Sequence, residues 1–289
     1  MATIGIDIGA YHHAVAFCRD GQVEADRKVL RISADRDGFA ALDALLAAVG
    51  PVERVALESS GHYWFGIASH LAQQGVPVAV LNPLASTYFA KRRLQRAKSD
   101  PADARTLAAL AMVDRPRTKE PLAGAELREA ARFAMALVQE QARTCQRILR
   151  LVDIGFPELR EAYDDPGCLS ALALLRVAPT ARAAGRRRVE SLAKARTAGG
   201  RTVGPKKAAQ IHAAAQRTVA APELEAQVGF EMELLIARHD FLEQQLAQAD
   251  ARLATLVDSD LARRLQTIPG VGRGDGRGAD RRDWRHLSL

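Results

Sequence analysis

Four acidic residues among the first 103 positions stand where carboxylates can do chemistry. Asp7 lies inside an apolar run, between two isoleucines, and Glu58 lies near the end of a second apolar run at 54–59. A strand that is buried on both faces has little reason to carry an unpaired carboxylate, because burying that charge costs free energy. Asp100 and Asp103 come at the start of a predicted helix, where their i, i+3 spacing puts them on one face.

The chemistry that such a set predicts is metal-assisted phosphoryl transfer. Four carboxylates from two strands and one helix start can hold two Mg²⁺ ions about 4 Å apart, which activates a nucleophile and stabilises a leaving oxygen at phosphate. Simpler interpretations exist for three of the acids: Asp100 as a helix N-cap, Asp103 as a first-turn acid, and Glu58 as the partner of an arginine. Because all four fall in one α/β unit, we interpret them as metal ligands and catalytic residues.

Basic residues adjoin the acids. The run KRRLQRAK at 91–98 leads directly into Asp100, and a second cluster, GRRR, occupies 185–188. The chain carries a net charge of +7, which favours a polyanionic partner. We therefore expect contacts with nucleic acid from Lys91, Arg92, Arg93, Arg96, Lys98, Arg186, Arg187 and Arg188. The histidines show no metal-ligand spacing.

A second interpretation uses the same first strand. The segment GIDIGAYHHAVA at 5–16 also fits the first phosphate-binding hairpin of actin-like ATPases and sugar kinases. Those folds need a further Asp-Gly-Gly loop for the nucleotide. The Asp-Gly pairs at 20–21 and 37–38 lack the additional glycine, so the ATPase is the less favoured alternative.

The elements that must position the acids follow from hydrophobic periodicity. Three strands joined by an Asp20-Gly21 hairpin turn predict an antiparallel meander, and a later strand–helix–strand unit predicts a right-handed parallel crossover. Together they indicate an α/β domain with a mixed sheet and helices on its faces. The predicted strands are 2–9, 13–19, 22–32, 54–59 and 76–82, and the predicted helices are 37–50, 63–74 and 101–113.

Beyond residue 115 the pattern is helical throughout. Residues 124–153 predict one long amphipathic helix, 169–221 several short ones, and 222–258 a long helix that begins at Pro222. That last helix carries a stripe at alternating steps of three and four, typical of a coiled coil. The stripe fits a dimer seam and the core-facing side of a bundle equally well. Its members are Leu235, His239, Leu242, Leu246, Ala249, Leu253 and Leu256.

Composition excludes several classes of protein. Hydrophobic residues make up 48% of the chain, which is enough for a sizeable core, and no uncharged run reaches the length of a membrane span. The three cysteines form no CxxC pair, which argues against a disulfide scaffold and a structural zinc site. The start MATIGIDIG has an acid where a signal peptide keeps its apolar core, so we expect a cytoplasmic protein.

Three stretches of the chain resemble, in order and spacing, the DEDD transposases of the insertion sequence 110 family, relatives of the Piv/MooV DNA invertases. The motifs with most specificity are ESSGxYW, LNP and KSDxxDA. The stretches, at 4–16, 56–108 and 265–272, read IGIDIGAYHHAVA, ALESSGHYWFGIASHLAQQGVPVAVLNPLASTYFAKRRLQRAKSDPADARTLA and LQTIPGVG.

This resemblance implies a RuvC-like, RNase H-type domain over 1–115, whose acidic tetrad falls on Asp7, Glu58, Asp100 and Asp103. It implies a helical and coiled-coil region over 116–262 that serves dimerisation, and a nucleoid-associated enzyme that uses Mg²⁺ to move DNA. Some members take a guide RNA as a further partner. The IPGVG turn would open the carboxy-terminal domain of helix-hairpin-helix type, which supplies a serine nucleophile in the family.

The end of the chain departs from the family. Residues 273–289 hold five arginines, have no apolar periodicity and match no catalytic-serine motif; Ser288 receives no role. We interpret 263–289 as the start of a truncated domain whose tail results from a frameshift. The expected function is a transposase or recombinase crippled by that loss, with a catalytically silent, nucleic-acid-binding remnant as the alternative.

Overall fold

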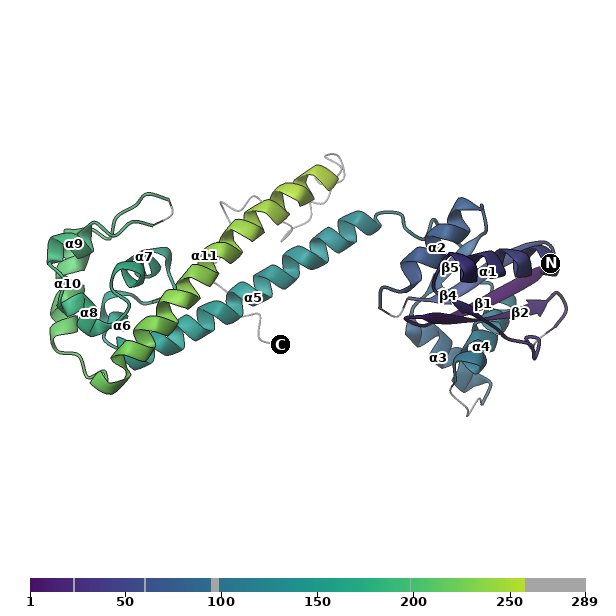
Figure 1. The fold of residues 1–289 in the computed structure, drawn as a ribbon, viewed down its shortest axis with the longest axis horizontal. Helices are drawn as coiled ribbons and strands as arrows, with labels where there is room; N and C mark the ends of the chain where they lie inside the picture. The colour runs from purple at the N-terminus through teal and green to yellow at the C-terminus, as the bar shows by residue number, and fades with distance from the viewer. Residues whose placement is uncertain (23, 60, 95–98, 198, 258–289) are drawn as a thin grey trace. The chain divides into compact units, whose positions relative to one another are not determined.

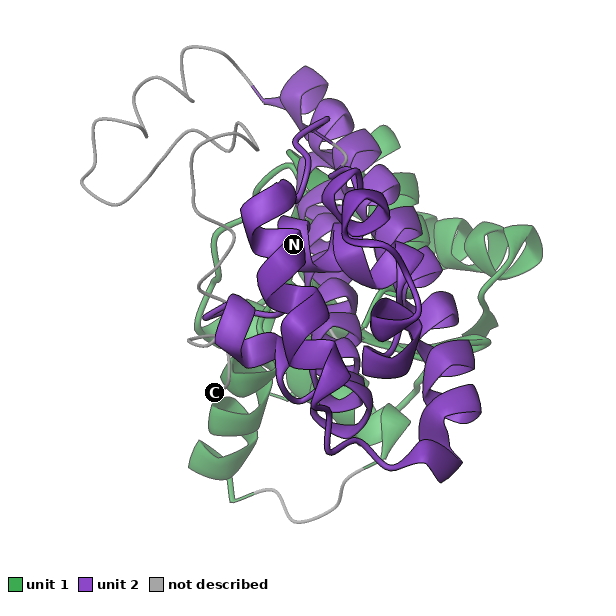
Figure 2. Cartoon of the chain, turned by 90° about the vertical axis from the view of Figure 1, so that its left-hand side faces the viewer, with its two compact units in different colours: residues 1–125 green, residues 126–289 purple. Residues whose placement is uncertain are grey.

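The computed structural model describes residues 1–257 apart from 23, 60, 95–98 and 198; residues 258–289 are not described. The chain divides into two compact units, which we call unit 1 (residues 1–125) and unit 2 (residues 126–289) (Figure 2). The expected third domain at 263–289, with its IPGVG turn and tail, therefore lies outside the described residues. No helix in the described part of the chain combines the length and the hydropathy that a membrane crossing requires.

Unit 1 is built around a five-stranded mixed sheet, as predicted (Figure 1). The strand order is β3-β2-β1-β4-β5, in which β1 pairs antiparallel with β2 and parallel with β4. The elements are β1 (Ala2–Ile8), β2 (His12–Arg19), β3 (Leu30–Ser33), α1 (Arg36–Val49), β4 (Val52–Glu58), α2 (Trp64–Gln73), β5 (Val78–Leu81), α3 (Pro83–Arg92) and α4 (Asp100–Val113).

The third strand is shorter than the sequence predicts. The expected strand at 22–32 is wrong over most of its length, because pairing with β2 extends only over Leu30–Ser33. Gly21 does turn the chain, with φ 81°. The charged residues that follow leave the ladder, and the Asp26 carboxylate accepts a hydrogen bond from the Lys28 N–H at 2.9 Å. Such local side-chain bonds compete with strand pairing.

The two faces of the sheet are covered by different helices. On one face, Ile4 and Ile6 of β1 join a buried cluster that also contains Leu42 of α1 and Ile67 of α2. The other face is covered by α4, in which half of the residues from 102 to 111 are alanine and eight of the ten are buried. Small side chains let the α4 backbone approach the strands closely.

Unit 2 is helical, as predicted, and is dominated by two long helices (Figure 1). The single helix expected at 124–153 and the broken helices expected at 169–221 are both present. The elements are α5 (Ala125–Gly155), α6 (Leu159–Ala162), α7 (Leu169–Val177), α8 (Ala181–Gly185), α9 (Val189–Ala193), α10 (Pro205–Gln216), the 3₁₀ turn η1 (Pro222–Leu224) and α11 (Glu225–Leu256).

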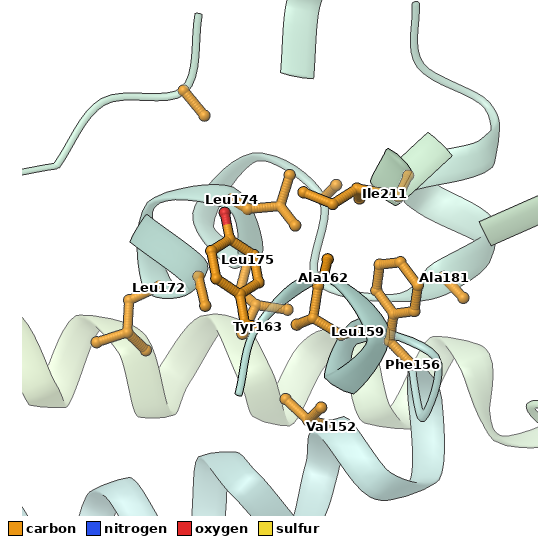
Figure 3. Packing of buried hydrophobic residues seen from close by; sticks show 14 of the residues in the cluster. Val152, Phe156, Leu159, Ala162, Tyr163, Leu172, Leu174, Leu175, Ala181 and Ile211 are labelled. Atoms are coloured by element: carbon orange, nitrogen blue, oxygen red, sulfur yellow. The ribbon is translucent and has the colours of Figure 1, made fainter. Parts of the chain in front are cut away.

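The short helices of unit 2 share one core with the C-terminal half of α5. Figure 3 shows Phe156, Leu159 and Tyr163 packed with side chains from α7 and α10, among them Leu174 and Ile211. Phe156, Leu159 and Leu174 are fully buried. The cluster also includes Val228, Met232 and Ile236 of α11.

The coiled-coil stripe of α11 packs within the chain. Leu242, Leu246 and Ala249 are buried against Ala134 and Leu137 of α5. The structure therefore supports the interpretation of this stripe as the core-facing side of a helix pair. A dimer formed through the same side chains would require α5 and α11 to separate.

Candidate active site

Asp7 belongs to the face of the sheet that α4 covers. Alternate residues of β1 point to opposite faces, so Asp7 shares a face with Thr3 and Gly5. The Thr3 hydroxyl donates a hydrogen bond to the Ala108 carbonyl at 2.8 Å. A Cβ atom on Gly5 would lie 2.2 Å from the carbonyl oxygen of Ala104, so the α4 backbone rests directly on this strand. The half-buried Asp7 side chain consequently projects on the α4 side.

Glu58 projects from the same face of the neighbouring strand. β4 pairs in parallel with β1, and Ala56 lies beside Gly5 in the register. Ala56 packs on Leu107 of α4, which fixes the face, and Glu58 is two residues further along the strand. Ile6 pairs with Leu57 in the register. The next residue on each strand is an acid, Asp7 on β1 and Glu58 on β4, so the two acids lie at the same level of the sheet.

The direction of α4 brings its two acids to this end of the sheet. Ala108 lies over Thr3, and Ala104, one turn earlier in the helix, lies over Gly5. Moving toward the start of α4 therefore corresponds to moving along β1 toward Asp7. Asp103 is half-buried and Asp100 is exposed. Ser99 holds the N-cap position, so the interpretation of Asp100 as the N-cap is wrong; Asp100 is the first helical residue.

The four acids have the chemistry that a divalent cation requires. Carboxylate oxygens are the hard ligands that Mg²⁺ prefers, and all four come from one face and one end of the sheet. Among the described residues, however, no three His, Cys, Asp or Glu side chains lie close enough together to hold a metal ion.

Glu58 has a positioning partner that the sequence interpretation missed. The Ser86 hydroxyl, on α3, donates a hydrogen bond to Glu58 Oε2 at 2.5 Å. We did not predict α3, although its start carries a clear signal: Asn82 precedes Pro83, and the Asn82 side chain accepts a hydrogen bond from the Leu84 N–H. This start signals the helix that carries Ser86, but not the contact of Ser86 with Glu58.

His13 is buried but lies away from the acids. It is on β2, where Ala14 and Ala16 face α4, so His13 points to the opposite face. Burial, together with the neighbouring charge of His12, lowers the pKa of His13 below its ordinary value, which keeps the ring neutral at pH 7. It is therefore no part of the acidic site.

The expected nucleic-acid contacts near the acids are partly engaged in ion pairs. Arg92 pairs with Asp114 at 2.7 Å, and Arg93 pairs with Glu24 at 3.5 Å. Lys91 is exposed at the end of α3. The remaining two expected contacts, at 96 and 98, lie outside the described residues.

The three arginines expected to contact nucleic acid at 186–188 differ in their surroundings. Arg186 forms an ion pair with Glu225, whereas Arg187 and Arg188 are exposed.

The sheet order and the strand directions define the class of protein. Three antiparallel strands followed by two parallel ones, with β1 at the centre, form an RNase H-like, RuvC-like domain. Residues 4–157 match the family model of the DEDD transposases of the insertion sequence 110 type. Because the match spans more than half of its residues, the chain belongs to this family. The match gives no support to the actin-like ATPase interpretation.

Two solved structures are similar to part of the chain. One is RuvC of T. thermophilus in complex with a Holliday junction substrate, with 17% identity, a TM-score of 0.33, and coverage of 41% of this chain and 99% of that one. The other is a Thermus thermophilus RuvC structure, with 17% identity, a TM-score of 0.32, and coverage of 41% and 100%. A comparison with the curated proteins found no match.

Proposed function

We propose that this transposase cleaves DNA phosphodiester bonds at a Mg²⁺ site formed by Asp7, Glu58, Asp100 and Asp103. The observation that carries the proposal is their common placement on the α4 face, at one end of the sheet. When bound there, Mg²⁺ supplies a Lewis acid that stabilises charge developing on phosphate oxygens.

The protein's own contribution is to hold the carboxylates in place. Asp7 is fixed by a central strand, and Glu58 is oriented by the hydroxyl of Ser86. Asp100 and Asp103 lie in the first turn of α4, where the helix dipole favours negative charge. The carboxylates are therefore held by the sheet, by Ser86 and by the start of α4.

DNA is the substrate in this proposal. The cations at 91–98, which adjoin the acids in the sequence, would contact its phosphates and offset the repulsion between the backbone and the acids, and those at 186–188 would contact its phosphates from unit 2. The dimer through the helix at 222–258, the guide RNA, the domain limits 1–115 and 116–262 and the bacterial, nucleoid-associated location are proposals that rest on the family resemblance.

The test compares the purified chain with Asp7→Asn in Mg²⁺-dependent cleavage of branched DNA. We expect the substitution to reduce cleavage by more than about 100-fold, because even residues that only orient metal ligands change affinity or activity 10- to 100-fold. Asp20→Asn is the matched control, since it removes a carboxylate from an exposed turn. Binding of DNA without any cleavage by the wild-type chain would instead support the silent remnant.

Thermal melting gives a second readout that does not depend on catalysis. Without Mg²⁺, Asp7→Asn should melt at a higher temperature than the wild type, because it relieves repulsion among the acids. Added Mg²⁺ should stabilise the wild type more than the variant. A wild-type melting temperature that does not respond to millimolar Mg²⁺ would contradict a metal site.

A further inference from the structure

The positive charge of the chain is concentrated in the short helices of unit 2. Residues 166–222 contain eleven Lys and Arg and a single acid, Glu190, for a net charge of +10. The remaining 30 Lys and Arg are outnumbered by 33 Asp and Glu, for a net charge of −3. The excess of positive charge therefore belongs to this segment, which lies outside the RNase H-like domain.

The fold turns these cations outward. Between α9 and α10 the side chains alternate: Leu192 and Ala195 are buried in the unit 2 core, whereas Lys194 and Arg196 are exposed. The chain then returns through an exposed Arg201 and a buried residue at 203. Because Leu192 and Ala195 occupy the core, the side chains of Lys194 and Arg196 face the solvent.

Backbone hydrogen bonds hold this connection in shape. The Val203 N–H donates to the Ala195 carbonyl at 3.0 Å, and the Gly204 N–H donates to the Ala193 carbonyl at 3.1 Å. The connection extends beyond the ends of α9 and α10 as a hairpin-like projection (Figure 1). These hydrogen bonds fix the backbone of 193–195 against that of 203–204.

Six of these cations form what we call the basic patch, and all are exposed. In the described part of the chain, none of the six pairs with a carboxylate. By contrast, Arg182 and Arg186 pair with Glu225, and Arg217 pairs with Glu161. The patch consists of Arg187, Arg188, Lys194, Arg196, Arg201 and Lys206.

We infer that the basic patch is a second DNA-binding surface, separate from the acidic site, which holds the phosphate backbone of a duplex. Arg188 and Lys194 cap the two ends of α9, which is about 8 Å long. That length is comparable with the separation of neighbouring phosphates along one strand, so the two cations can reach adjacent phosphates. Unpaired cations at this spacing match a regular row of negative charges.

Duplex binding is favoured over single strands by the absence of aromatic residues. Proteins that bind single strands stack the bases on aromatic side chains. Residues 164–229 contain no Phe, Tyr or Trp. This segment can therefore attract the phosphate backbone by charge, but it offers no aromatic ring on which a base could stack. The choice of DNA as the duplex rests on the proposed function.

The test measures binding of the full chain to a short labelled DNA duplex by fluorescence anisotropy, without Mg²⁺, across a series of salt concentrations. The variant is Lys194→Ala/Arg196→Ala/Arg201→Ala, which removes exposed charges only. Its matched control is Arg132→Ala/Arg238→Ala/Arg252→Ala, which removes three cations of α5 and α11 that each pair with an acid of α5.

We expect the patch variant to bind DNA at least 10-fold more weakly at physiological salt. The slope of log affinity against log salt should fall by about 2.7, at about 0.9 per lost phosphate contact. The control should keep both values near those of the wild type. Circular dichroism and melting of each variant exclude unfolding as the cause.

Three results would overturn the inference: wild-type binding by the patch variant, an equal loss in the control, or a patch-dependent preference for duplex RNA or single-stranded DNA. The outcome is independent of cleavage. A chain that binds through the patch but never cleaves would contradict only the proposed function. A chain that cleaves, with no role for the patch in binding, would contradict only this inference.

Discussion

At the scale of single residues, the acidic site depends on how each carboxylate is oriented. Glu58 stands at the end of a strand, where its backbone is fixed but its side chain has several rotatable bonds. The hydroxyl of Ser86 restricts the rotation of this side chain, because it donates a hydrogen bond to one carboxylate oxygen. Oriented ligands bind metal more tightly, because less conformational entropy is lost on binding.

Ser86→Ala should therefore raise the Mg²⁺ concentration needed for half-maximal cleavage by about 10-fold or more. Ser86→Thr should restore the wild-type value, since it keeps the hydroxyl. Thr87→Ala is the matched control, because Thr87 lies on the same helix and its hydroxyl donates to the Pro83 carbonyl, as that of Ser86 also does. An unchanged Mg²⁺ requirement in Ser86→Ala would show that the hydrogen bond has no part in positioning Glu58.

Single residues also show what the sequence could reveal about the site. Asp7 was recognisable because a charge inside an apolar strand conflicts with burial. Ser86 was not, because an exposed-type residue on an unpredicted helix violates no rule. Its role arises only when α3 is placed beside β4, and that placement is a tertiary fact.

At the scale of elements, close packing of α4 on the sheet creates the site. Gly5 and the alanines of α4 remove side-chain volume from the contact, so Thr3 can reach the Ala108 carbonyl. The acids lie just beyond this contact, at the end where the helix begins. The periodicity of the sequence predicted α4 as a helix, but the direction in which α4 crosses the sheet comes from these contacts.

The helix pair of α5 and α11 illustrates what periodicity leaves undetermined. A stripe at steps of three and four specifies that a helix packs on another helix, and it does not specify which one. The partner is α5 of the same chain, because Ala134 and Leu137 present the complementary apolar surface. The two interpretations of the stripe were equally compatible with the sequence for that reason.

Leu242→Ala with Leu246→Ala should destabilise unit 2 by about 4 kcal/mol or more, because each buried leucine typically contributes 2–5 kcal/mol. The matched control is Leu234→Ala with Phe241→Ala, whose side chains on α11 are 55% and 58% exposed. That control should change stability little. Chemical denaturation followed by circular dichroism measures both. Equal stability losses in the two variants would show that the stripe is not preferentially buried.

At the scale of the whole molecule, the apolar cores follow the division into two units. The three buried clusters around the sheet draw only on unit 1, and the two clusters of α5 to α11 draw only on unit 2. A core that is complete within one unit can melt without the other, since cooperative unfolding depends on shared packing. The proposed functions divide in the same way, with the acidic site in unit 1 and the basic patch in unit 2.

Calorimetric unfolding of the chain should accordingly show two transitions, each assignable by a substitution. Gly5→Ala should lower only the transition of unit 1, by about 10 °C, because its new methyl group would meet the α4 backbone at 2.2 Å and overpacking costs about 3 kcal/mol. Leu242→Ala, in the α5–α11 contact, should lower only the transition of unit 2.

Gly21→Ala is not a suitable control, since Gly21 has φ 81° and its replacement is strained by itself. Gly66→Ala, in α2 of unit 1, serves instead, because a Cβ atom there would meet only Phe39 Cζ at 3.8 Å, an ordinary contact. A single transition that both substitutions lower together would mean that the units unfold as one, and that the acidic site and the basic patch share a common stability.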